Sequence, residues 1–136
     1  MKIFTLREIL ILIFMTSILS VVGSLYFSDI VGLVPCTLCW YQRIAIYPIP
    51  VLTGVALLRE EYNVVYNLRI LSLFGLLVAG YQYYIQFFHL TSNFCHVGVS
   101  CSDVQFEILG FITLPLLSFL SFLFILILTF MVKKND

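Results

Sequence analysis

The sequence predicts an all-α integral membrane protein, in which a single domain over residues 1–136 folds as a bundle of four transmembrane helices. Hydrophobic residues make up 62% of the chain and charged residues only 10%, whereas ordinary globular domains carry about 25% charged residues. The mean hydropathy is +1.09. Apolar runs of about 20 residues, the length that crosses a hydrocarbon layer of ~30 Å, recur along the chain.

The four apolar runs cover residues 9–27, 38–58, 67–88 and 108–132. The first run follows Lys2 and Arg7, as a signal peptide would, but it is longer than the usual apolar region of about 7–15 residues, and no A-x-A-like cleavage site follows it. We therefore expect it to be a retained helix. Outer loops are expected at about 28–37 and 89–107, so the lipid bilayer surrounds nearly the whole chain.

The distribution of cations predicts the orientation of the bundle. One group of cations falls at the N-terminus, the middle connection and the C-terminus, which share one side of the membrane if there are four spans: Lys2, Arg7, Arg59, Arg69, Lys133 and Lys134. Arg43 alone lies near an outer connection. Both termini are therefore predicted to be cytoplasmic in a multi-pass protein of the cell membrane. The net charge is zero, which gives no reason to expect a nucleic-acid partner.

The second helix is expected to begin in the segment PCTLCWYQR, residues 35–43. With Pro35 in its first turn, Cys36 and Cys39 share one face, and Cys39 and Arg43 are one turn apart. A thiolate at a helix N-terminus beside a guanidinium has a lowered pKa and is the reactive form of cysteine. The alternative is a structural disulfide, with Arg43 reaching lipid phosphates.

The second cysteine pair, Cys95 and Cys101, lies in the segment CHVGVSC of the second outer loop. A short, exposed disulfide loop is readily reduced. All four cysteines are thus predicted to lie outside the cytoplasm, where disulfides persist, and they allow three connectivities. Ser102 and Gln105 then have the spacing of a capping box for the start of the last helix.

Two redox-capable pairs on one membrane face predict an electron relay. Electrons would enter at the exposed pair and pass by thiol–disulfide exchange to the pair at the membrane surface. The sequence has no recognisable haem, flavin or iron–sulfur pattern, and we predict no metal site. A lipid-soluble quinone is therefore the natural electron acceptor.

Polar residues on the third helix are candidates for contact with the quinone. Gln82, Gln86 and His89 follow i, i+4, i+7 spacing, and polar groups at this depth are expected to face the bundle. They would hydrogen-bond the quinone or join neighbouring helices. In the second helix, Pro48 and Pro50 remove backbone donors and predict a kink.

Four segments of the chain resemble those of a known protein family. The segment CTLCWYQR resembles the signature of the DsbB family of disulfide-forming quinone reductases. The segments LRILSLFGLLVAGYQYYIQ, CHVGVSC and LGFITLPLLSF look more like its short BdbC-type branch. The resemblance covers essentially the whole chain. The six-residue spacing of the second cysteine pair is shorter than in the longer relatives.

The resemblance implies a thiol:quinone oxidoreductase that supports disulfide bond formation. Cys39 would react with a membrane quinone, either menaquinone or ubiquinone, and Arg43 would stabilise the thiolate and the developing quinol anion. Cys95 would be attacked by a DsbA-like thiol oxidase of the thioredoxin fold. Cys101 would pass the electrons to Cys36. His89 lies near the position of a histidine that is associated with the quinone in longer relatives.

Three other functions compete with this interpretation. An enzyme similar to vitamin K epoxide reductase would place its C-x-x-C late in the bundle, whereas here it precedes the second helix. A zinc site made of four thiolates has suitable ligands but an unusual spacing. The third alternative is a structural four-span protein with disulfide-stapled outer loops.

Overall fold

The computed structural model describes residues 5–30, 32, 37–61, 63–88, 107–108 and 112–132. In these residues the helices are α1 (Leu6–Leu25), its π-helical continuation η1 (Tyr26–Ile30), α2 (Thr37–Ile46), α3 (Pro48–Arg59), α4 (Val64–Phe87) and α5 (Leu114–Met131). Strands β1 (Glu107–Ile108) and β2 (Ile112–Thr113) pair antiparallel. The predicted helical bundle is confirmed, with one short strand pair added to it.

Within the described residues, three helical segments are long and apolar enough to cross a membrane: Leu6–Ile30, Leu38–Arg59 and Val64–Phe87. The segment Pro115–Met131 is a shorter apolar helix. These segments correspond to the four apolar runs of the sequence.

The start predicted for the last helix is wrong. We expected helix from residue 108, but 107–108 and 112–113 are extended and α5 begins at Leu114. Pro115 gives the physical reason, because proline fits the first turn of a helix and not its interior. Ser102 and Gln105, the expected capping box, lie outside the described residues, well before the start of α5.

The beginning of α1 is fixed by a capping box. The Glu8 amide donates to the Thr5 hydroxyl at 3.3 Å, and the Thr5 amide donates to the Glu8 carboxylate at 2.8 Å. This arrangement satisfies two of the backbone donors that a helix leaves free at its N-terminus. The helix therefore begins at Leu6, before the apolar run at 9–27.

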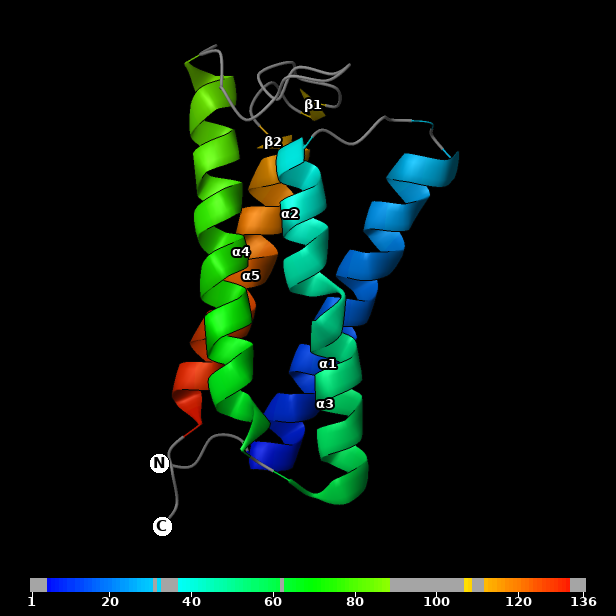
Figure 1. Ribbon diagram of the computed structural model, residues 1–136, viewed down its shortest axis with the longest axis vertical. Coiled ribbons are helices and arrows are strands. Elements are labelled where there is room, and N and C mark those ends of the chain that lie inside the picture. Colours follow the sequence, from blue (N-terminus) through cyan, green and yellow to red (C-terminus); the bar gives the residue numbers. More distant parts are fainter. Residues whose placement is uncertain are drawn as a thin grey trace.

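The predicted kink in the second apolar run is confirmed. The run divides at Tyr47 into α2 and α3, and Pro48 is the first residue of α3. The Tyr47 amide still donates to the Arg43 carbonyl at 3.0 Å, but Pro48 and Pro50 have no amide hydrogen to continue the series. The two halves of the segment are visibly offset in Figure 1.

The helices run back and forth between two ends of the bundle (Figure 1). We call the end that holds η1, the start of α2, the end of α4 and the start of α5 the cysteine end, because Cys39 lies there in α2. α4 packs against α5 and α2, and α1 packs against α3 and α5. Toward the cysteine end, α1 diverges from α2 (Figure 1).

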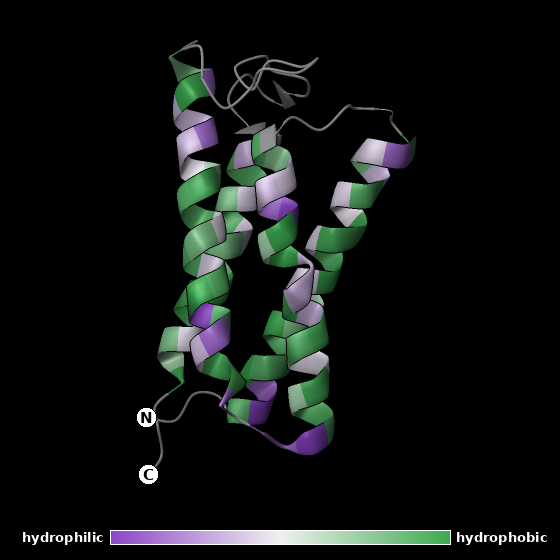
Figure 2. Ribbon diagram, in the orientation of Figure 1, coloured by the Kyte–Doolittle hydropathy of each residue, from purple (hydrophilic) through white to green (hydrophobic). Residues whose placement is uncertain are grey.

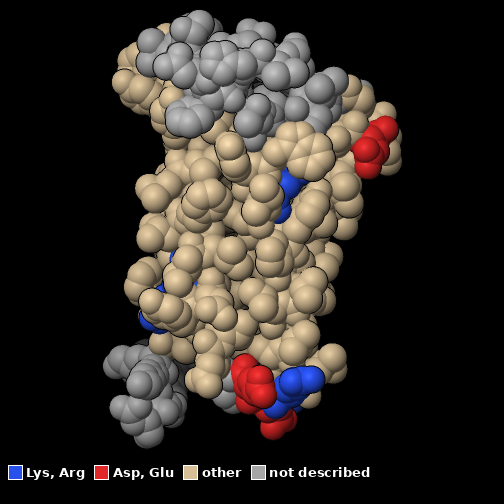
Figure 3. Space-filling model, viewed as in Figure 1, with Lys and Arg blue, Asp and Glu red and all other residues tan. Residues whose placement is uncertain are grey.

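Many large hydrophobic side chains are exposed on the outside of the bundle. Figure 2 shows mostly hydrophobic helices with hydrophilic residues near their ends, and one hydrophilic turn inside α2, which carries Gln42 and Arg43. Figure 3 shows a wide, mostly uncharged surface on this face, with a cluster of acidic and basic side chains at the end opposite the cysteine end, one acidic patch at the cysteine end and a few basic atoms between them. An apolar exterior of this kind suits a lipid solvent. The core itself draws on every helix of the bundle, including Leu10, Ile49, Leu68 and Ile125.

Candidate functional site

Cys39 lies in the first turns of α2 and is half-buried. Gln42, three residues further along the same helix, is also buried, and Gln82 of α4 contacts both side chains. The Gln82 amide nitrogen lies 3.3 Å from the Cys39 sulfur. Its amide oxygen accepts a short hydrogen bond from Gln42. Gln82 and Gln42 are 2% and 7% exposed, so this polar contact between α2 and α4 is buried.

The glutamines of the third predicted helix face the bundle, as expected. Gln82 and Gln86 are both buried in α4. Gln82 contacts Cys39 through its amide. His89, the third polar residue predicted to lie on this face of the helix, is outside the described residues.

Arg43 lies one turn beyond Cys39 and reaches from α2 to α1. Its Nε donates to the Ser24 hydroxyl at 3.0 Å, and its Nη2 donates to the Ser24 carbonyl at 3.2 Å. Its guanidinium carbon lies 5.1 Å from the centroid of the Trp40 ring, in a cation–π contact. The charge is thus held between a ring on its own helix and the backbone and side chain of α1.

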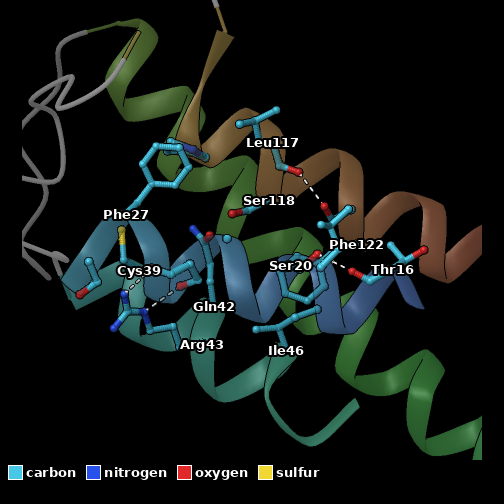
Figure 4. Close-up of a pocket in the computed structure, with 16 residues that line it drawn as sticks. Thr16, Ser20, Phe27, Cys39, Gln42, Arg43, Ile46, Leu117, Ser118 and Phe122 are labelled. Atoms are coloured by element: carbon cyan, nitrogen blue, oxygen red, sulfur yellow. Dashed lines mark hydrogen bonds between the residues drawn. The ribbon is translucent and has the colours of Figure 1, made fainter. Parts of the chain in front are cut away.

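Cys39 and Arg43 both line a cavity of about 350 Å³ between α1, α2 and α5. Figure 4 shows Cys39, Gln42 and Arg43 along α2, with Phe27 near the Cys39 sulfur and Leu117, Ser118 and Phe122 facing them from α5. The apolar part of the lining consists of Leu19, Gly23, Phe27, Ile46, Pro115, Leu117 and Phe122.

Hydroxyl groups form the polar wall of the cavity. On α1 and η1 they recur every fourth residue, at Thr16, Ser20, Ser24 and Ser28. We did not predict these residues as part of a site. The signal was available in the sequence, because hydroxyls at i, i+4, i+8 and i+12 share one face of an otherwise apolar helix. Ser118 and Ser121 add two hydroxyls from α5.

Arg43 gives the cavity its charge. Among the described residues that line it, Arg43 is the one ionisable side chain with a permanent charge. In a low-dielectric surrounding, a fixed cation favours ligands that carry or develop negative charge. The cavity therefore combines an apolar body, a cationic donor and a cysteine sulfur, which suits a lipophilic, electron-accepting ligand that develops negative charge as it reacts with a thiol.

The structure brings together only part of the predicted site. Cys39 and Arg43 line the cavity, and Gln82 contacts Cys39 without lining it. Gln86 is buried in α4 and also does not line it. The remaining predicted site residues lie outside the described residues: Cys36, Cys95, Cys101 and His89.

Comparisons with known proteins bear on this site. Residues 6–132 match the family model described as "Disulfide bond formation protein DsbB". The chain is 41% identical over 117 residues to the SPbeta prophage-derived disulfide bond formation protein B of Bacillus subtilis, covering 85% of this chain and 79% of that protein. It is 34% identical over 133 residues to a probable disulfide formation protein of Oceanobacillus iheyensis, covering 96% and 92%. No solved structure matches the chain.

Proposed function

The chain belongs to the DsbB family of disulfide bond formation proteins, and on this premise we propose that it is a membrane thiol:quinone oxidoreductase. In this proposal it reoxidises an extracytoplasmic, DsbA-like thiol oxidase and passes the electrons to a membrane quinone. Family membership supports the role in disulfide bond formation.

The observation that carries the proposal is the shared cavity of Cys39 and Arg43. Its volume of about 350 Å³ falls within the usual range of small-molecule pockets, about 300–1,000 Å³. The side chains that line it fit a quinone, because Phe27, Ile46 and Leu117 offer apolar surface to a flat ring. Arg43 and the hydroxyl groups offer polar contacts to the ring oxygens.

The proposed reaction transfers two electrons and two protons. A dithiol of the partner protein becomes a disulfide by exchange with the pair Cys95 and Cys101, and this pair passes its reducing equivalents by the same exchange to Cys36 and Cys39. Closing the bond between Cys36 and Cys39 releases two electrons and two protons, and quinone, the second substrate, leaves as quinol. We assign Cys39 to the quinone because it lines the cavity.

Arg43 is proposed to stabilise negative charge during this transfer. Its guanidinium supplies a fixed positive charge and hydrogen-bond donors. A fixed donor in a water-poor cavity stabilises developing negative charge more strongly than water does. Sulfur and quinone oxygen both carry such charge as the electrons move.

The proposed role of Gln82 is to hold Cys39 and not to bind the quinone. Its amide is directed at the sulfur and at Gln42, and it does not line the cavity. Gln86 does not line the cavity either, so the predicted contact between its side chain and the quinone is not proposed, whereas His89 remains a proposed secondary contact. The cavity lies on the α1 and α5 side of Cys39, and α4 supports the cysteine from the other side.

We further propose that α5 is the fourth membrane span and that both termini are cytoplasmic. α5 has 18 residues, which extend about 27 Å at 1.5 Å per residue, close to the thickness of a bilayer core of ~30 Å. An even number of spans places the cation-rich connections together on the cytoplasmic side. The cysteine end then faces the outside of the cell membrane.

The test of this function is the ultraviolet absorbance of ubiquinone-1 or menaquinone-4 mixed with the purified protein and a reduced thioredoxin-like dithiol partner. We expect catalytic loss of the oxidised-quinone band. Cys39→Ser should abolish this loss while the protein still inserts and folds, because it removes the sulfur that is proposed to react with the quinone. Serine variants of Cys36, Cys95 and Cys101 should each stop turnover with the partner.

Two outcomes would overturn the proposal. Turnover retained in Cys39→Ser would remove this residue from the mechanism. No consumption of either quinone with several dithiol partners would favour a structural disulfide or a metal site, and bound zinc and thiol protection would then be measured on the same preparation.

A further inference from the structure

Ser24 makes a different kind of hydrogen bond from Thr16 and Ser20, the hydroxyl residues that precede it on the cavity-lining face of α1. Thr16 and Ser20 donate to the carbonyls four residues earlier, Leu12 at 2.8 Å and Thr16 at 2.9 Å. Such bonds are local to one helix. Ser24 instead accepts a bond from a different helix, through its hydroxyl oxygen and again through its carbonyl.

Two contacts to one residue fix the orientation of the Arg43 side chain. The guanidinium has five donors in one plane, and Ser24 takes one from Nε and one from Nη2. A planar group held at two of its nitrogens cannot rotate about its own axis. The Trp40 ring, 5.1 Å from the guanidinium carbon, lies against the same group. The other donors are then left for the cavity that Arg43 lines.

The contact with Ser24 lies where the backbone of α1 changes its helix type. Ser24 is in the last turn of α1, directly before the π-helical segment η1 (Tyr26–Ile30). A π-helical turn changes the regular pairing of backbone groups and occurs often at functional sites. Here the change comes where the Ser24 carbonyl accepts a bond from Arg43.

We infer that Ser24 is a positioning residue for Arg43: it aims the guanidinium into the cavity where the quinone binds. The inference rests on the proposed function, in which Arg43 stabilises negative charge during electron transfer. It adds a positioning residue on α1 to the two reactive residues of α2, Cys39 and Arg43. It also gives α1 a part in the chemistry beyond that of a cavity wall.

The test compares single variants in the quinone assay, with ubiquinone-1 as the probe and dithiothreitol as the electron donor, after subtracting the rate without protein. Ser24→Ala should lower kcat/KM for quinone about five- to tenfold, because it removes one hydrogen bond to a charged group and leaves the bond to the carbonyl. The loss should fall mainly on kcat, since the charge that Arg43 meets develops during the reaction. Ser24→Thr keeps the hydroxyl and should restore most of the rate.

Ser17→Ala is the matched control. Ser17 is a fully buried serine on the same helix whose hydroxyl donates to the Phe14 carbonyl at 2.9 Å, and it does not line the cavity. The substitution removes a hydroxyl from α1 without touching Arg43, so turnover should remain at the wild-type level. An equal loss in Ser17→Ala and Ser24→Ala would overturn the inference.

A second background separates positioning from general loss of stability. In Arg43→Ala, the further change Ser24→Ala should have no additional effect, because the residue that it positions is gone. A fold defect would instead lower turnover by the same factor in both backgrounds, and that result would contradict the inference.

The failures of the two proposals can also be told apart. If Arg43→Ala leaves quinone reduction unchanged, the proposed role of Arg43 falls and Ser24 has nothing to position. If Arg43→Ala lowers the rate while Ser24→Ala does not, the role of Arg43 stands and only the inference about Ser24 falls.

Discussion

At the scale of single residues, Cys39 lies between two different surroundings. On one side Gln82 directs its amide at the sulfur at 3.3 Å. On the other side the sulfur borders the cavity that it shares with Arg43. Leu38 and Ile85 pack beside it in a small buried cluster. The cysteine is therefore held by α4 while it remains accessible from the cavity, which is the arrangement that a reactive but well-oriented sulfur requires.

The buried amide contact predicts the effect of replacing Gln82. Gln82→Leu should lower the free energy of unfolding by about 1 kcal/mol, because Gln42 would keep a buried amide without the oxygen that now accepts from it. It should also change the reactivity of Cys39. We would measure thermal unfolding in detergent, together with the rate at which Cys39 reacts with iodoacetamide when the other cysteines are serine.

Ser72→Ala on the same helix is the control for this prediction. Ser72 is fully buried, and its hydroxyl has no hydrogen-bond partner among the described residues. Removing this hydroxyl should leave stability unchanged or slightly higher. If Gln82→Leu is as stable as Ser72→Ala and Cys39 reacts at the wild-type rate, then the contact of Gln82 with the sulfur has no structural importance.

The sequence predicts some of these residues and not others. Cys39 and Arg43 are recognisable because C-x-x-C followed by arginine is unusual at the start of an apolar run. The hydroxyl stripe that begins at Thr16 and Ser20 was missed, because serine and threonine are common in membrane helices, where they often join neighbouring helices. Only the packing of α1 against α2 and α5 shows that this face borders a cavity.

At the scale of helices, prolines explain why the second apolar run divides into two helices and why the last helix begins later than its apolar run. Pro48 and Pro50 divide one apolar run into α2 and α3, as predicted. Pro115 marks the first turn of α5, and we did not use it to locate that start. A hydropathy run measures only the apolar character of a segment, so it cannot separate the extended residues at 107–108 and 112–113 from the helix that follows.

Packing between α4 and α5 depends on Gly75. A side chain added there would overlap the ring of Phe122, which is 2% exposed and also lines the cavity. Gly75→Val should therefore push Phe122 into the cavity and lower the free energy of unfolding by about 1–3 kcal/mol, the usual cost of an overfilled core. Thermal unfolding in detergent measures the stability, and the KM for ubiquinone-1 should rise because the cavity becomes smaller.

Gly80→Ala is the matched substitution on the same helix. Its added methyl group would lie 3.4 Å from the ring of Phe119, an ordinary contact distance. We expect little change in stability and none in KM. A Gly75→Val variant with the stability and KM of Gly80→Ala would show that the bundle adjusts freely at this position, contrary to the prediction.

At the scale of the whole molecule, composition predicts more than arrangement. The apolar runs and the positions of charged residues are enough to expect a helical membrane bundle. The order in which helices pack is not readable from hydropathy, because each helix is apolar on most of its surface. Packing of α1 against α3 and α5, with divergence from α2 at the cysteine end, is what creates the cavity.

The orientation of this bundle in the membrane gives the last prediction. In a variant whose native cysteines are all serine, one cysteine is introduced at Asp29 in η1 or at Glu61 between α3 and α4, both of which are exposed. A maleimide that cannot cross membranes is then added to intact cells. Asp29→Cys should be labelled, and Glu61→Cys should be labelled only after permeabilisation.

The physical reason is the position of the cations. Arg59 stands two residues before Glu61, and Arg7 lies at the start of α1, at the same end of the bundle. Cationic segments stay on the cytoplasmic side during insertion, so this end is expected inside the cell and the cysteine end outside. Labelling of both positions in permeabilised cells shows that both are reactive. The reverse pattern in intact cells would place Cys39 and its cavity on the cytoplasmic side, where thiols are kept reduced, and the proposed oxidation of an extracytoplasmic partner would then be impossible.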